Sequence, residues 1–315
     1  MQVGNSSKNC IKPKFTFLAP NPNSSPEQAG TNLQIPSSFY TVKNLGAKTP
    51  AAAMNHSPNL LDEALGLTGR GFGGGALSQG RVVLVEDCVE TSGAFVLHHL
   101  VKRALSPDIG GTVIFIALSH PFSHYDRILR KLGCNLSMHR EHNRFHFVDM
   151  LKVEFPNEIQ KNAVEHGLVD LYSKILRAVE VSSSGDYSRA HISIVIDDLS
   201  ILEIVSHGSV DHVLDFLHYC ITLTSEQDCS LVILNHEDIY PEIEAPRLLS
   251  HLIYLADFVI KAEPLVTGIA ADVHGQLTVL KKGTFNDSQY TDKASNFHFQ
   301  VKENGVELFF PGTRC

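Results

Sequence analysis

The chain has 315 residues, 43% of them hydrophobic, so it can bury a full-sized core as one large domain or two small ones. Its formal net charge of −8 gives no overall attraction for nucleic acid, so RNA contact requires a local basic patch or a partner. The six cysteines form no CxxC pair, which argues against a zinc ribbon or disulfide framework and favours a reducing compartment. The longest apolar run, residues 113–118, is too short to span a bilayer, so no membrane protein is predicted.

Residues 1–54 are interpreted as an extension that lies outside the fold. Half of the 14 prolines lie between Pro13 and Pro58, among Asn and Ser clusters without helical or strand periodicity, which predicts disorder. The lysines and serines resemble a transit peptide in part, but arginine is absent. Plain disorder or an upstream start is therefore favoured over cleavage and import. Residues 55–315 are then expected to form one domain.

From there short β-branched runs alternate with helical patterns, which is typical of a parallel α/β sheet. The predicted strands cover residues 81–86, 112–119, 145–150, 191–198 and 231–234. The predicted helices cover residues 93–104, 125–132, 157–181 and 210–224. After an apolar segment at 248–260, alternation at 276–282 and 296–310 around the turn 303–305 predicts antiparallel strands at a sheet edge. We expect an α/β domain with a mainly parallel central sheet, an antiparallel edge and helices on both faces.

Residues 90–95 stand where a nucleotide-hydrolysing α/β domain carries its phosphate-binding loop, between the first strand and a helix. The expected motif there is GxxxxGK[ST]. Gly93 has the position of the second glycine, but Ala94 replaces the lysine that meets the phosphates and Phe95 replaces the hydroxyl that holds magnesium. The remaining residues of this degenerate loop are Glu90, Thr91 and Ser92.

Acidic residues around the loop also argue against a bound phosphate. Glu86, Asp87 and Glu90 lie close together in the sequence, and a like-charge contact at ~4 Å costs about 1 to 4 kcal/mol, depending on the dielectric. An ordinary strand–turn–helix corner without a ligand is favoured over a non-standard nucleotide site. Asp197 and Asp198 fit the acidic strand end that orients magnesium and water in a working site, but without a lysine opposite they are interpreted as capping acids. No cofactor is predicted.

Two other patterns are interpreted as structural. The glycine string at residues 69–75 precedes a strand instead of following one, which predicts a flexible connector. Suggestive histidine spacings occur at His120, His124, His139, His142 and His146. Because no HExxH motif, carboxylate triad or thiolate pair accompanies them, solvated or hydrogen-bonded histidines are favoured over a metal site.

Five segments occur together in one order: SHPFSHY at 119–125, KLG at 131–133, DDLS at 197–200, VLDFLHYC at 213–220 and DVHGQL at 272–277. With the first strand and the degenerate loop, they closely resemble the Elongator complex protein 6 family over about residues 55–315. The resemblance implies a RecA-like fold without working nucleotide motifs. It also implies assembly with Elongator proteins 4 and 5, two copies of each, in a six-membered ring.

The resemblance carries further functional implications. In this family the ring binds tRNA and serves the larger Elongator complex, which modifies the wobble uridine of tRNA through chemistry in a different subunit. The implied role is thus a pseudo-ATPase subunit in the cytoplasm and nucleus. Residues 1–54 depart from the family's compact start, which puts in question their presence in the working protein.

The sequence offers one local candidate for a tRNA contact. The loop after residues 231–234 is acidic, and its charged residues are Glu237, Asp238, Glu242, Glu244 and Arg247. That loop should repel a phosphate backbone. Arg127, Arg130 and Lys131 place three cations within five residues on one predicted helix, with Arg140 and Arg144 nearby. A solvated helix face is the favoured interpretation of this cluster, and an RNA contact is the alternative.

Two other functions are alternatives for an α/β domain of this kind. An independent ATPase with an atypical loop is the main alternative, and a lysine in place of Ala94 would have favoured it. A free-standing dinucleotide-binding protein requires a GxGxxG motif after a strand with an acid about 20 residues later, and the sequence has none.

Overall fold

A single nine-stranded sheet organises the part of the chain that the computed structural model describes. That part comprises residues 59–68, 77, 80–151, 161–184, 191–206, 210–240, 247–266, 268, 270, 272–283 and 292–313. The strand order is β3-β2-β4-β5-β1-β6-β7-β8-β9, so the first strand in sequence lies in the middle of the sheet.

Six neighbouring strands pair in parallel. They are β1 (Val82–Asp87), β2 (Thr112–Ala117), β3 (Phe145–Asp149), β4 (Ile192–Ile196), β5 (Ser230–His236) and β6 (Phe258–Glu263). Every residue of β1, β2 and β4 is buried, because helices cover both faces of the sheet there. This burial explains why these strands are continuous apolar runs in the sequence and do not alternate.

The other three strands form the antiparallel edge: β7 (Gly275–Lys281), β8 (Lys293–Lys302) and β9 (Gly305–Phe309). Buried and half-buried residues alternate along β7, as expected for a sheet with one covered face. Gly275 is required for close packing, because a Cβ atom at this position would lie 2.7 Å from the Phe299 ring and 2.8 Å from the Glu263 carbonyl oxygen.

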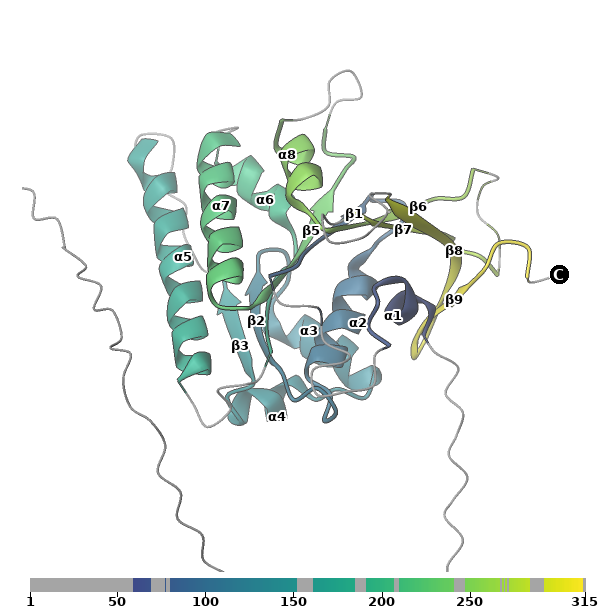
Figure 1. The fold of residues 1–315 in the computed structure, drawn as a ribbon, viewed down its shortest axis with the longest axis horizontal. Coiled ribbons are helices and arrows are strands. Elements are labelled where there is room, and N and C mark those ends of the chain that lie inside the picture. Colours follow the sequence, from purple (N-terminus) through teal and green to yellow (C-terminus); the bar gives the residue numbers. More distant parts are fainter. Residues whose placement is uncertain are drawn as a thin grey trace, which may run out of the picture. The chain divides into compact units, whose positions relative to one another are not determined.

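Two groups of helices cover the two faces of the sheet (Figure 1). One group consists of α1 (Leu60–Ala64), α2 (Ala94–Ala104), α3 (Phe122–Lys131) and α4 (Leu136–Glu141). The other consists of α5 (Lys161–Ser183), α6 (Leu199–Val205), α7 (Val210–Glu226) and α8 (Arg247–Leu255). Each group packs on its own apolar core, and the side chains of Phe115 and Ile114 on β2 point into the two different cores.

The fold class expected from the sequence is confirmed: a mainly parallel sheet, an antiparallel edge and helices on both faces. The helix predicted at 125–132 begins earlier, at Phe122, directly after the extended Pro121 at its N-cap position. No helix of the described residues has the length and hydropathy needed to cross a membrane. The predictions for residues 1–54 and for the glycine string at 69–75 lie outside the described residues.

Candidate functional site

The loop between β1 and α2 lies at the carboxyl ends of the parallel strands, the edge where open α/β sheets bind ligands. β1 ends at Asp87, Cys88 and Thr91 form an isolated bridge, and Gly93 is the N-cap of α2. A Cβ atom at Gly93 would lie 3.0 Å from Val85 Cγ1 and 3.2 Å from Asp87 Cβ. The glycine of the degenerate motif thus allows close packing of helix on strand.

Four backbone N–H groups of the loop are bonded inside the protein. The N–H of Gly93 donates to Asp87 Oδ2 at 2.7 Å, and that of Ala94 donates to Ser92 Oγ at 3.3 Å. The N–H of Thr91 donates to the Cys88 carbonyl oxygen at 3.0 Å, and that of Val89 to Asp238 Oδ2 at 2.8 Å. These four donors are therefore already satisfied without a ligand.

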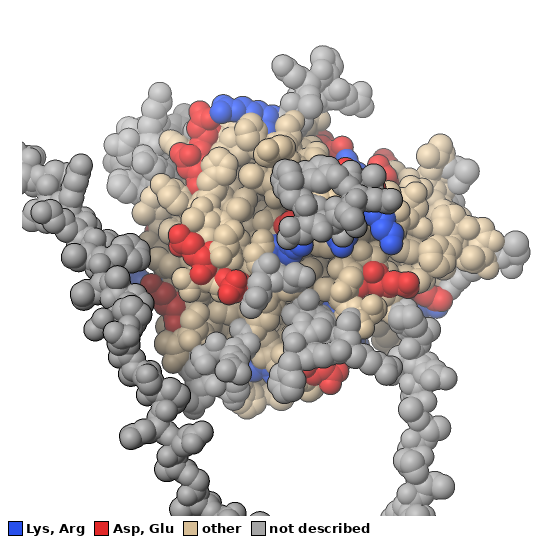
Figure 2. Space-filling model, in the orientation of Figure 1, with Lys and Arg blue, Asp and Glu red and all other residues tan. Residues whose placement is uncertain are grey.

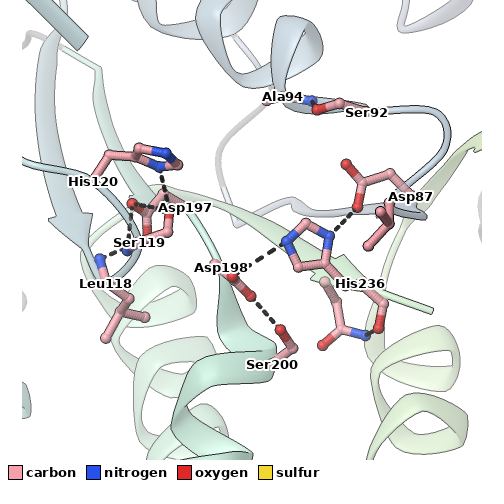
Figure 3. Close-up of polar contacts among 12 residues, drawn as sticks. Asp87, Ser92, Ala94, Leu118, Ser119, His120, Asp197, Asp198, Ser200 and His236 are labelled. Atoms are coloured by element: carbon pink, nitrogen blue, oxygen red, sulfur yellow. Dashed lines mark hydrogen bonds and ion pairs between the residues drawn. The ribbon is translucent and has the colours of Figure 1, made fainter. Parts of the chain in front are cut away.

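Asp87, His236 and Asp198 form a charged bridge across three strand ends (Figure 3). Nδ1 of His236, at the end of β5, lies 2.5 Å from Asp87 Oδ1, and Nε2 lies 3.2 Å from Asp198 Oδ2. The Asp87 side chain is fully buried and the Asp198 side chain nearly so. Hydrogen bonds to Asp198 and Asp87 raise the pKa of His236 to about 10, although burial opposes this shift. Both ring nitrogens of His236 thus lie beside carboxylate oxygens, an arrangement that favours the imidazolium.

Asp197 serves a different part of the same edge (Figure 3). Its carboxylate accepts hydrogen bonds from the N–H of Leu118 at 2.7 Å, from the N–H and hydroxyl of Ser119 at 3.2 and 3.0 Å, and from the hydroxyl of Tyr125. Burial raises the pKa of Asp197, and these bonds oppose the rise. The residue joins the end of β4 to the end of β2 and the start of α3.

The interpretation of the two aspartates as helix-capping acids needs correction. Asp198 stands at the N-cap position of α6, but its side chain makes no capping bond to the backbone and accepts from the Ser200 hydroxyl instead. Asp197 bonds the loop after β2 and caps no helix. Both acids join strand ends: Asp198 pairs with His236 at the end of β5, and Asp197 accepts from the N–H groups of Leu118 and Ser119 after β2.

Glu86 and Asp87 point to opposite faces of the sheet, so the three acids near the loop do not act together as the spacing suggested. The side chain of Glu86 is fully buried, and the Nζ atom of Lys261 on β6 lies 2.7 Å from its Oε2 atom. Burial raises the pKa of Glu86, while Lys261 opposes the rise. Of the three acids only Glu90 is exposed, and the buried carboxylate of Asp87 itself occupies a loop donor, the N–H of Gly93.

The residues that replace the lysine and the hydroxyl have structural roles. Ala94 is the first residue of α2 and is half-buried. The ring of Phe95 packs against that of Phe299 on β8, with centroids 4.9 Å apart. This contact ties α2 to the antiparallel edge. In place of a magnesium ligand, the chain has an aromatic packing contact.

Of the histidines with suggestive spacing, one pair stacks and a third lies beside a serine hydroxyl. His120 and His124 stack with ring centroids 4.1 Å apart, and the Ser182 hydroxyl lies 3.3 Å from Nε2 of His146. Among the described residues, no group of three or more His, Cys, Asp or Glu is arranged to hold a metal ion. The sequence carries no signal for His236 or Lys261. His236 ends β5 and Lys261 lies in β6, and these are the two strands that pair with β1.

The basic cluster is defined as Arg127, Arg130 and Lys131, and all three residues are exposed on α3. Together with Phe122, Ser123 and Asp126, they line an open depression. Arg130 NH2 lies 2.6 Å from Asp126 Oδ2, an ion pair one helical turn away.

Arg140 and Arg144 have structural partners. The Arg140 guanidinium lies over the Phe122 ring, 5.5 Å from its centroid, and Arg144 donates to the carbonyl oxygens of Gly111 and Leu105 at 3.1 and 3.0 Å. On the face drawn in Figure 2, Lys and Arg side chains lie in separate groups among Asp and Glu. A contact with a phosphate backbone would therefore involve one small group of basic side chains and not a continuous basic surface.

Comparisons with known proteins agree with this geometry. A KaiC-like protein from the archaeon Pyrococcus horikoshii has a similar structure, with a TM-score of 0.50 and 13% identity over 75% of this chain and 92% of that one. That likeness shows a RecA-like fold. The Elongator complex protein 6 of Homo sapiens is 31% identical over 247 residues, which are 74% of this chain and 91% of the human one. That of Xenopus laevis is 29% identical over 251 residues, 75% of this chain and 92% of the frog one. Residues 72–303 match the family model of Elongation complex protein 6, and the chain belongs to that family.

Proposed function

We propose that the chain is a non-catalytic subunit of the Elongator complex, which modifies the wobble uridine of tRNA in the cytoplasm and nucleus. The subunit assembles with Elongator complex proteins 4 and 5 into a hexameric ring. Family membership supports a role as a subunit. The RecA-like sheet has a parallel core and one antiparallel edge, and copies of such a domain can close a ring through heterologous contacts.

One observation carries the non-catalytic part of the proposal. Four N–H groups of the loop after β1 are bonded to the protein itself, and the positively charged side chain beside them, His236, is held between two carboxylates. A nucleotide would have to break these bonds and then bind without a lysine or a hydroxyl for magnesium. An independent ATPase, the alternative, would need an open loop.

Co-expression with Elongator complex proteins 4 and 5, followed by size-exclusion chromatography with light scattering, tests the assembly. We expect all three chains to elute together at the mass of a hexamer with two copies of each. A chain that elutes alone while its two candidate partners form their own complex would contradict the proposal.

We further propose that the assembled ring contacts tRNA through the basic cluster on α3. Arg127 and Lys131 are exposed, and the depression that they line also contains the polar side chain of Ser123. Changing all three cations of the cluster to Glu should weaken tRNA binding, most of all at low salt, because each lost phosphate contact reduces the salt slope by about 0.7 to 0.9.

The matched control reverses Lys174 and Arg177 on α5 and Arg247 on α8, with the same change in net charge. Lys174 and Arg247 are ion-paired to Asp170 and Asp211, much as Arg130 is paired to Asp126. If the control weakens tRNA binding as strongly as the α3 variant in intact rings, the effect is one of overall charge. If the α3 variant breaks the ring, the cluster is an assembly surface.

A further inference from the structure

The carboxylate of Asp87 lies where the N-terminus of α2 would otherwise meet an external anion. One oxygen accepts the N–H of Gly93 at 2.7 Å, and the other lies 2.5 Å from Nδ1 of His236. α2 has 11 residues, so the partial positive charge at its N-terminus favours an anion here. A peptide N–H and a side-chain cation are also the donors that a phosphate oxygen meets in a working loop.

His236 completes this arrangement from β5. Its second ring nitrogen faces Asp198, which follows β4, so both nitrogens lie next to carboxylate oxygens. Carboxylates only accept hydrogen bonds, so both ring nitrogens must donate, which only the protonated imidazolium can do. Among the described residues, Asp87 and Asp198 are the charged groups that contact the ring. His236 and Asp87 end β5 and β1, Asp198 follows β4, and the order of these strands in the sheet is β4-β5-β1.

We propose that Asp87 and His236 form an internal plug: the carboxylate takes the place of a bound anion, the imidazolium takes the place of the lysine, and together they tie the ends of β1, β4 and β5 without a ligand. Asp198 anchors the other side of the imidazolium. The plug is a property of the single chain and does not depend on the proposed ring.

The first test removes the carboxylate with Asp87→Ala and adds inorganic phosphate at constant ionic strength. Loss of the side chain leaves the Gly93 N–H and the partly exposed His236 ring facing the position that the carboxylate filled. Phosphate should then raise the midpoint of thermal unfolding of D87A, because a ligand that binds only the folded state stabilises it. It should leave the wild-type midpoint unchanged.

Two matched variants identify the source of any response. Adding His236→Gln to D87A removes the cation and should abolish the effect of phosphate. Asp197→Ala also deletes a buried carboxylate that accepts backbone N–H bonds at this edge, but that carboxylate pairs with no cation among the described residues, so no response is expected. A folded D87A that ignores phosphate, or a response that survives His236→Gln, overturns the proposal.

The second test keeps the side-chain shape and needs no cavity. In the wild type, nitrogen NMR should show both ring nitrogens of His236 protonated at neutral pH. Asp87→Asn retains an acceptor for Gly93 but removes the charge, so the midpoint of His236 titration should fall by about 1 to 3 pH units. His251, whose ring bonds only to the Arg247 carbonyl oxygen in the described structure, serves as the internal control. A neutral His236 at pH 7 in the wild type would refute the plug.

Discussion

Restoring the two lost motif residues should not restore nucleotide binding, and it should destabilise the protein. In the double variant A94K/F95S, the loop regains its lysine and its hydroxyl, but Asp87 still occupies the Gly93 N–H. Phe95 is half-buried against Phe299. Truncating a fully buried Phe costs about 3 to 5 kcal/mol and an aromatic pair adds about 0.5 to 1.5, so a half-buried ring is worth about 2 to 3 kcal/mol.

The chain has no Trp, so urea unfolding is best followed by circular dichroism, with calorimetry for Mg-ATP. Phe95→Leu keeps apolar contact and should lose less than half as much stability. If A94K/F95S binds Mg-ATP, the missing motif residues, and not the occupied N–H groups, are what exclude nucleotide. If its unfolding midpoint matches the wild type, the contact between Phe95 and Phe299 contributes nothing.

Three further changes have defined outcomes. Deleting residues 1–53 should leave the urea midpoint unchanged, whereas deletion through residue 68 should lower stability by at least about 2 kcal/mol, because it removes buried Leu61 and the ion pair of Asp62 with Arg103. Equal urea midpoints for the two deletions would contradict this boundary. Because the folded pKa of His236 is raised, its contribution to stability is complete below its unfolded pKa near 6.5 and is lost as pH rises towards about 10. His236→Gln should abolish this loss, and stability–pH profiles that run parallel in the wild type and the variant would disprove it. Gly275→Ala should lower the free energy of unfolding in urea by about 1 to 3 kcal/mol, because its Cβ atom would clash with Phe299. An unchanged midpoint would show that the Phe299 ring can move aside without loss of stability.

Local elements of the fold could be predicted wherever the sequence pattern was strong. The buried runs that became β1, β2, β4 and β5 and the alternating strands around residues 303–305 were all identified. The short helices α1, α4 and α6 were missed, because five to seven residues show too little periodicity to separate a helix from a loop. The apolar segment at 248–260 predicts no single element, because it spans most of α8 and the start of β6.

From the sequence, the site could be predicted only as a phosphate-binding loop that lacks its lysine and its hydroxyl residue. The sequence showed that Ala94 and Phe95 break the motif, but not that Phe95 packs on a strand two hundred residues later. It showed clustered acids, but the alternation of β1 places Glu86 and Asp87 on opposite faces. The partner of Asp87, His236, lies 149 positions away, and only the strand order brings the two together.

Calorimetric titration of the isolated chain with Mg-ATP tests the central claim most directly. Because four N–H groups of the loop are bonded internally and Ala94 and Phe95 stand in place of the motif's lysine and hydroxyl, we predict no measurable binding. A dissociation constant below about 100 µM, equivalent to about −5.5 kcal/mol, would contradict the account, because a working site should exceed that affinity comfortably.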